Sequence, residues 1–128
     1  MRNRYVLAAL AILSALGLAA CETSSGQTRA AATVTGGDPH RGSAAIYKYG
    51  CGSCHTISGI SNARGLVGPP LTGIGARMYV AGVLENNHDN IEKWIQNPKS
   101  INEKTVMPVL GVTQQDATDI AAYLYSTK

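Results

Sequence analysis

Two stretches in the body of the chain have the sequence pattern of a helix, one marked by its capping residue and the other by its apolar face. Asp38 is a suitable N-cap for the first, which has Pro39 at its first helical position and runs to about Tyr49. The second begins around Asn87 and ends before Pro98. Its apolar face consists of Ile91, Trp94 and Ile95. Both stretches are therefore predicted to be helices.

A third helix is predicted near the C-terminal end of the chain. Thr113 and Asp116 form a capping-box pattern, with Asp in place of the usual Glu or Gln. Apolar residues then recur at the spacing i, i+3, i+4 and i+7, at Ala117, Ile120, Ala121 and Leu124. Residues 59–82 are rich in Gly and Pro and are predicted to be loop. Because no segment alternates between apolar and polar residues as a strand would, we expect an all-α domain.

The first 20 residues have the pattern of an export signal. Two arginines precede an uncharged run over residues 5–20, which is short for a transmembrane helix and typical of the apolar part of a signal peptide. The run ends in Leu-Ala-Ala-Cys at residues 18–21, which resembles the lipobox of bacterial lipoproteins. We therefore expect Cys21 to be acylated and to become the new N-terminus. The alternatives are an ordinary signal peptide or an uncleaved anchor, with an incidental Cys.

These patterns divide the chain into a signal peptide (1–20), the acylated Cys21 with a flexible tether (21–36), and a folded domain (37–128). The tether is rich in Ser, Thr, Ala and Gly and shows no apolar periodicity. We expect the domain to be lipid-anchored in the periplasm or at the outer face of the cell membrane. Without residues 1–20, nine Lys and Arg stand against eight Asp and Glu, a net charge of +1. This small net charge, with no block of Lys and Arg, argues against a nucleic-acid partner.

The sequence Cys51-Gly52-Ser53-Cys54-His55 is the attachment signature of c-type haem. Its two thiols add across the two vinyl groups of the porphyrin, and the imidazole of His55 reaches the iron. A thioredoxin-like dithiol would need a βαβ context, a structural zinc site would need four ligands, and a plain disulfide would leave His55 unexplained. We therefore expect one haem c, attached through Cys51 and Cys54 and bound to iron by His55.

The sixth iron ligand separates an electron carrier from a haem enzyme. Met107 is followed by Pro108, so it lies outside a helix interior, in a rigid loop that suits the presentation of a thioether. Met78 lies in a Gly-rich loop and is more simply a packing residue, and His88 lies at the exposed start of a helix. Met107 is the expected ligand, and Met78, His88 or an open site remain alternatives.

From Gly37 to its C-terminal end the chain resembles the class I cytochromes c. The similar segments are Gly42 with Ile46 and Tyr47, residues 119–124, and the loop at residues 68–71. The resemblance implies three to four helices around one covalently attached haem. It places Tyr47 at the aromatic site of the first helix, and it brings Ile120 and Tyr123 of the last helix against the Gly42 face.

The same resemblance implies roles for three residues around the haem. The carbonyl of Pro69 would accept a hydrogen bond from the ring of His55, which orients the imidazole and raises its basicity. Arg77 would lie near the haem propionates, and the indole N–H of Trp94 would reach one of them. For Trp94, plain core packing on an amphipathic helix is the alternative.

The middle of the chain is similar to a narrower group, the cytochrome c domain fused to subunit II of some bacterial haem–copper oxidases. The shared segments are residues 54–59, 68–72, 81–86 and 94–98, although Pro70 stands where Asp is common and the sequence contains no subunit II domain. The resemblance implies a non-catalytic, single-electron carrier of a respiratory chain. A quinol-oxidising complex or dehydrogenase would precede it, and an oxidase or reductase would follow.

Two other functions remain open at this point. The first is a haem protein with an open or labile sixth site, suited to peroxide reduction or gas sensing. The second is a fixed electron-transfer subunit of a dehydrogenase or reductase.

Overall fold

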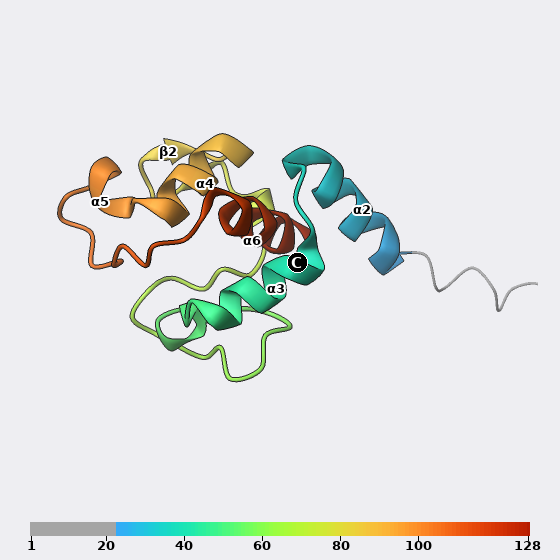
Figure 1. The fold of residues 1–128 in the computed structure, drawn as a ribbon, viewed down its shortest axis with the longest axis horizontal. Coiled ribbons are helices and arrows are strands. Elements are labelled where there is room, and N and C mark those ends of the chain that lie inside the picture. Colours follow the sequence, from blue (N-terminus) through green and yellow to red (C-terminus); the bar gives the residue numbers. More distant parts are fainter. Residues whose placement is uncertain (1–22) are drawn as a thin grey trace, which may run out of the picture.

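The computed structural model describes residues 23–128, so the predicted signal peptide and Cys21 lie outside the described residues. The helices are α2 (Thr23–Thr35), α3 (Pro39–Lys48), α4 (His88–Gln96), α5 (Pro98–Ile101) and α6 (Gln114–Ser126). Two 3₁₀ turns, η1 (Cys51–Ser53) and η2 (Ile74–Ala76), and two short strands, β1 (Tyr79–Val80) and β2 (Leu84–Glu85), complete the order. In Figure 1, α2 and α5 lie at opposite ends of the long axis, with α6 between them. No helix within residues 23–128 is long and apolar enough to cross a membrane.

The three predicted helices are confirmed, together with the side chains that start them. Asp38 accepts a hydrogen bond from the amide of His40 at 2.8 Å and caps α3. Thr113 accepts from the amide of Asp116 at 3.1 Å and caps α6, and Asn87 caps α4 in the same way. Each cap satisfies an amide that the first helical turn leaves without a partner.

The predicted loop between α3 and α4 contains short regular elements that the sequence did not reveal. β1 and β2 pair antiparallel, with Tyr79 opposite Glu85 and Val80 opposite Leu84. Ala81, which has a positive φ of 55°, lies in the turn between them. Strands of two residues are too short to show an alternating pattern, so the domain remains essentially all-α as predicted.

α3 and α6 cross so closely at Gly42 that the two backbones touch. A Cβ on Gly42 would lie 2.0 Å from the carbonyl oxygen of Asp119 and 2.9 Å from the Cβ of Tyr123, so no larger residue fits. The hydroxyl of Tyr123 donates to the carbonyl of Ser58 at 2.7 Å. The expected contact between Gly42 and Tyr123 is thus confirmed, and Tyr123 also ties α6 to the segment that follows Cys51–His55.

The prediction that Tyr47 occupies the aromatic site of the first helix is wrong, because Tyr47 does not lie on the side of α3 that packs on α6. Ile46 is buried at 1% exposure, whereas Tyr47 is 74% exposed. One residue turns a helix by about 100°, so neighbours on α3 point in different directions. The side of α3 that packs on α6 therefore carries Gly42, Ala45 and Ile46, and Tyr47 lies on the outside.

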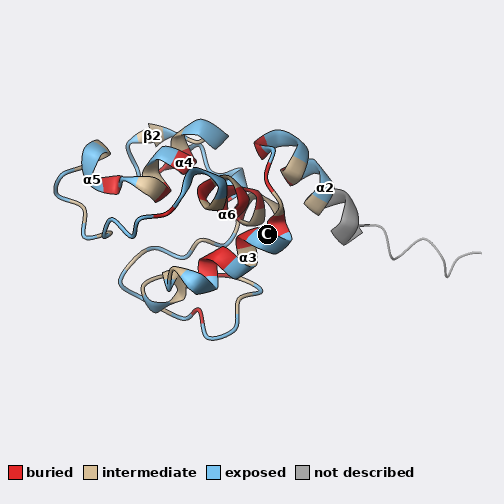
Figure 2. Ribbon diagram, in the orientation of Figure 1, coloured by how far each residue is buried: buried red, intermediate tan, exposed pale blue. Residues whose placement is uncertain are grey.

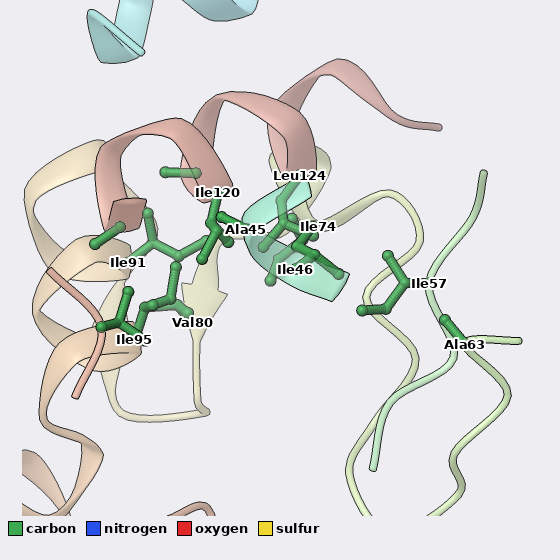
Figure 3. Packing of buried hydrophobic residues seen from close by; sticks show 13 residues of the cluster. Ala45, Ile46, Ile57, Ala63, Ile74, Val80, Ile91, Ile95, Ile120 and Leu124 are labelled. Carbon is green, nitrogen blue, oxygen red and sulfur yellow. The ribbon is translucent and has the colours of Figure 1, made fainter. Parts of the chain in front are cut away.

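The buried core is aliphatic and lies where α3, α4 and α6 meet. Figure 3 shows Ile46 of α3 near Leu124 of α6. One helical turn before Leu124, Ile120 lies near Ile91 of α4. Four aromatic side chains only flank this cluster, half-buried: Tyr49, Trp94, Tyr123 and Tyr125. Small aliphatic side chains fill little volume, which leaves room for a large cavity beside them.

The prediction of a flexible tether is wrong for Thr23–Thr35, which form helix α2. This helix packs on α6 and buries Ala31 and Thr35. The Thr35 hydroxyl donates to the carbonyl of Ala31 at 2.9 Å and accepts from the amide of Gly37 at 3.1 Å. Composition could not reveal this face, because Ala and Thr give a weak apolar signal and the helix that covers them is distant in sequence.

Asp119 is a buried carboxylate at the junction of α2, α3 and α6, with only 2% of its side chain exposed. It accepts hydrogen bonds from Nε and Nη2 of Arg41 at 2.8 and 2.9 Å, and from the backbone amide of Asp38 at 2.7 Å. Burial alone would raise the pKa of Asp119. The hydrogen bonds from Arg41 and Asp38 outweigh it and lower the pKa below its ordinary value.

Replacement of Asp119 by Asn should destabilise the haem-loaded protein at pH 7 by about 2 kcal/mol, because charge-assisted hydrogen bonds are lost. Folding lowers this pKa, so the stabilisation is fully present above the unfolded-state value of 3.8. It is lost as the pH falls through the folded-state pKa. Guanidinium unfolding at decreasing pH should therefore show the two stability curves converging in acid. The Glu103→Gln variant, at an exposed carboxylate, should follow wild type throughout. An Asp119→Asn deficit independent of pH would contradict the role of the ionised carboxylate.

Candidate haem site

A cavity of about 540 Å³ lies beside the core, lined by residues of α3, α4, α6 and the intervening loops. Much of its wall is aliphatic, including Ile46, Ile57, Leu71, Ile95 and Ile120. The seven residues predicted to attach, bind or contact haem all line it: Cys51, Cys54, His55, Pro69, Arg77, Trp94 and Met107. An apolar cavity with two thiols and an imidazole in its wall fits a covalently attached porphyrin.

The attachment motif leaves α3 through Gly50, whose φ of 68° turns the chain into η1. The amide of His55 donates to the carbonyl of Cys51 at 3.0 Å, which keeps both in one tight turn. Cys51 and Cys54 form no disulfide with each other, and burial raises the pKa of the Cys51 thiol. Both cysteines line the cavity, where the edge of a porphyrin would lie.

The ring of His55 is fixed by the loop that carries Pro69. Nδ1 of His55 lies 2.8 Å from the carbonyl oxygen of Pro69, which has only acceptor capacity, so Nδ1 carries the proton. Nε2 is then the nitrogen whose lone pair is available to iron. A Cβ on Gly68 would lie only 2.2 Å from Cε1 of His55, so glycine at this position lets the backbone pass against the ring.

Backbone hydrogen bonds hold this loop against the attachment motif. The amide of Gly68 donates to the carbonyl of Cys54 at 2.8 Å, and the amide of Gly65 donates to that of Gly52 at 3.1 Å. A Cβ on Gly65 would lie 2.4 Å from the carbonyl carbon of Cys54. After Pro69, the amide of Leu71 donates to the carbonyl of Thr56 at 2.9 Å. The position of the Pro69 carbonyl is therefore set by backbone contacts on both sides of it.

Met107 lines the cavity from the segment between α5 and α6. Its amide donates to the hydroxyl of Thr105 at 3.2 Å. Nζ of Lys99 donates to the carbonyl of Glu103 at 3.2 Å and also to the carbonyl of Thr105. No sequence pattern singles out Lys99, because a long flexible side chain can reach many carbonyls. In the structure it braces the segment that presents Met107.

The two alternative iron ligands lie elsewhere. Met78 is 78% exposed, and His88 is exposed, with its Nε2 2.7 Å from a carboxylate oxygen of Asp89. Neither residue lines the cavity. Of the three candidates, Met107 is therefore the one positioned to bind a metal there.

Arg77 and Trp94 bring hydrogen-bond donors to the cavity wall. Nη2 of Arg77 donates to the carbonyls of Pro70 and Thr72 at 2.6 and 3.2 Å, which fixes the guanidinium beside the His55 loop. The indole N–H of Trp94 makes no hydrogen bond to any residue that the structure describes. A propionate of a bound porphyrin would supply the acceptor that a half-buried indole needs.

Exposed apolar side chains surround part of the cavity. Val67, Val106 and Leu110 line it and are 69%, 78% and 39% exposed, and Leu66 beside Val67 is 88% exposed. The sequence did not single out these residues, because apolar residues in loops show no periodicity. Together, Leu66, Val67, Val106 and Leu110 form what we call the apolar rim.

Comparison with protein families matches residues 40–128 to the family described as Cytochrome c. Two similar proteins are cytochrome c oxidase subunit 2 of Alkalihalophilus pseudofirmus and cytochrome c oxidase subunit 2 of Bacillus sp. strain PS3. The first is 39% identical over 79 residues, which cover 61% of this chain and 22% of the relative. The second is 31% identical over 88 residues, which cover 66% of this chain and 25% of the relative. The chain thus spans about a quarter of the length of these relatives, and no solved structure matches it.

Substitution of Gly68 by Ala should disturb the imidazole of His55, because the added methyl cannot occupy the space of the ring. We expect a loss of about 1–3 kcal/mol in the stability of the haem-loaded protein. We also expect a higher reduction potential, because a lost hydrogen bond to Pro69 makes the imidazole a weaker donor to ferric iron. Guanidinium unfolding and a redox titration measure the two effects.

Gly73→Ala is the matched control for this experiment. A Cβ on Gly73 would meet no atom within 4 Å, but its φ of 65° makes Ala there strained. This control should lose about 1–2 kcal/mol from backbone strain and keep the wild-type potential. If Gly68→Ala also keeps the wild-type potential, the proposed link from loop to imidazole is wrong.

Proposed function

The chain belongs to the cytochrome c family, and on this premise we propose that it is a membrane-tethered, monohaem carrier of single electrons in a respiratory chain that ends in an oxidase. One observation carries the proposal. The attachment motif and Met107 line the same apolar cavity, which is the arrangement that a His- and Met-ligated haem c requires.

Each ligand has a separate task in this proposal. Cys51 and Cys54 would hold the porphyrin edge through thioethers, and His55 would bind the iron through Nε2. Met107 would bind the iron through its thioether sulfur, a ligand that favours the reduced state and raises the potential. When bound, the haem supplies a one-electron couple between ferric and ferrous iron. With both His55 and Met107 bound to the iron, no position would remain for a substrate at the metal, and we expect no enzymatic activity.

The similarity to oxidase subunit 2 supports an oxidase as the downstream partner. The apolar rim supports docking beside the cavity through a small, largely uncharged interface, as is usual for brief electron-transfer encounters. The small net charge predicts that salt changes the rate only modestly. Upstream, a quinol-oxidising complex or a dehydrogenase would reduce the protein.

The N-terminal sequence supports the place of action. Cleavage before Cys21 and its acylation would attach the domain to a membrane on the outer side, in the periplasm or at the outer face of the cell membrane. Two or more lipid chains hold a protein stably, because each buried CH₂ contributes ~0.8 kcal/mol. Covalent haem attachment also takes place outside the cytoplasm, so export and the attachment motif agree.

Substitution of Met107 by Ala should open the sixth iron site. The weak long-wavelength band of sulfur-ligated ferric haem should disappear, the ferric protein should become high-spin, and the reduced protein should bind carbon monoxide readily. Absorption spectra of the purified oxidised and reduced protein measure all three. Met78→Ala, a change at an exposed methionine, should leave them as in wild type. A wild-type protein that lacks the sulfur band, or that binds carbon monoxide readily, would instead favour the open-site alternative.

Substitution of Val67 by Lys should slow electron transfer to the oxidase, because a charge in the apolar rim must be desolvated when the partner docks. A loss of about 1.4 kcal/mol in binding corresponds to a tenfold slower second-order rate. Stopped-flow oxidation of the reduced protein by purified oxidase from the same bacterium measures it. Val83→Lys, at an exposed valine (54%) that does not line the cavity, is the matched control. Equal slowing by both variants would exclude the apolar rim as the docking surface.

A further inference from the structure

We propose that α2 is a rigid arm that fixes the orientation of the haem domain on the membrane. This inference rests on the lipid anchor at Cys21 proposed above. Only Glu22 separates Cys21 from Thr23, the first residue of α2. A helix of 13 residues is about 20 Å long, so the anchor would be joined to the domain through a helix rather than through a free chain.

The packing of α2 on α6 gives the arm its stability. Ala31 and Thr35, one helical turn apart, are 5% and 7% exposed. Figure 2 shows the buried positions of α2 near the end that leads into α3. An isolated helix of this length is marginal in water, so its order depends on this contact. Loss of the contact should therefore convert the arm into the flexible tether that its composition suggests.

The junction between α2 and α3 contains two consecutive glycines, a sequence typical of a hinge. Hydrogen bonds and packing contacts nevertheless restrain it. The amide of Gly36 donates to the carbonyl of Ala32 at 2.8 Å. The amide of Gly37 donates to the hydroxyl of Thr35, and a Cβ on Gly37 would lie 2.3 Å from the carbonyl oxygen of Thr118 on α6. The Gly36 bond extends α2 by one residue, and Gly37 is the glycine that packs directly against α6.

The same junction is hydrogen-bonded to the buried carboxylate of Asp119. The amide of Asp38, the next residue, donates to Asp119 at 2.7 Å. Gly37 and Asp38 therefore attach the path from α2 into α3 to α6. On this basis we expect α2 to keep its orientation relative to the domain.

The position of α2 determines which side of the domain the anchor would leave free. Figure 1 shows α2 at one end of the long axis and α5 at the other. Residues 102–110, which follow α5, include Met107 and part of the apolar rim, and several of them line the cavity. A lipid joined to α2 would therefore hold the domain by the end remote from this wall. The apolar rim would stay available to a partner at a constant orientation.

The test is the orientation of the haem in the full-length, acylated protein bound to phosphatidylglycerol–phosphatidylethanolamine bilayers stacked as oriented multilayers. Linear dichroism of the haem absorption bands reports the angle between the haem plane and the membrane. Ala31→Glu places a charge in the α2–α6 contact, whereas Ala30→Glu places it on the exposed side of α2. We expect equal, non-zero dichroism for wild type and Ala30→Glu, and a fall towards zero for Ala31→Glu.

Flotation distinguishes failure of the lipid anchor from failure of the orienting role of α2. Flotation with vesicles should be equal for wild type, Ala30→Glu and Ala31→Glu and lost for Cys21→Ala. If wild type does not float, the lipid anchor fails and the orienting role fails with it. If wild type floats but shows no dichroism, or if Ala31→Glu keeps the wild-type dichroism, the present inference alone is overturned.

Hydrogen exchange in the non-acylated Cys21→Ala background tests the docking without a membrane. Amides of residues 32–36 should exchange slowly, remain slow with Ala30→Glu, and exchange much faster with Ala31→Glu. Haem spectra and thermal unfolding of Ala31→Glu should show that the rest of the domain is intact. If Ala31→Glu does not fold, Thr35→Glu and its exposed partner Thr33→Glu provide a second matched pair. Fast exchange of these amides in wild-type α2 would overturn the proposal.

Discussion

The domain depends on the contact between the backbones of α3 and α6 at Gly42. Because a Cβ there would overlap the Asp119 carbonyl oxygen, the two helices can approach to a distance that no other residue allows. The contact brings Asp119 within hydrogen-bond distance of the Arg41 side chain and of the Asp38 amide. These hydrogen bonds stabilise the crossing of the two helices. The C-terminal end of α3 delivers the chain into the attachment motif. An error in the crossing would therefore displace the motif.

The haem cavity follows from the same packing. The core where α3, α4 and α6 meet is aliphatic and small, and a domain of about 90 residues with few buried aromatics gains little stability from burial alone. The cavity beside the core has a largely aliphatic wall that only a bound apolar group can shield from water. The porphyrin is in this sense a part of the core. Its covalent attachment through Cys51 and Cys54 keeps that part of the core from dissociating.

Sequence reasoning succeeded where the signal is local or chemical. Caps such as Asp38 and Thr113 act within one helical turn, and the spacing of Cys51, Cys54 and His55 is dictated by the porphyrin itself. It failed where burial is decided by a distant partner. The side of α2 that carries Ala31 packs on α6, almost ninety residues away in sequence, and Tyr47 is exposed only because of where the crossing places α3. Lys99 braces the Met107 segment through carbonyl groups, which every residue has and no sequence distinguishes.

α6 links the parts of the molecule that matter for electron transfer. One part of the helix receives α2 through Gly37 and Thr118, another receives α3 through Gly42 and Asp119, and Ile120 and Leu124 line the cavity. A force applied to α2 by a membrane would therefore pass into the same helix that forms a wall of the haem site. Since electron transfer requires a partner to meet one restricted surface, a carrier held at a fixed orientation would search fewer orientations in each encounter than one on a loose tether. A helical connection through α2, packed on α6, would hold the carrier at a fixed orientation. The flexible chain that the composition of residues 21–36 suggests would not.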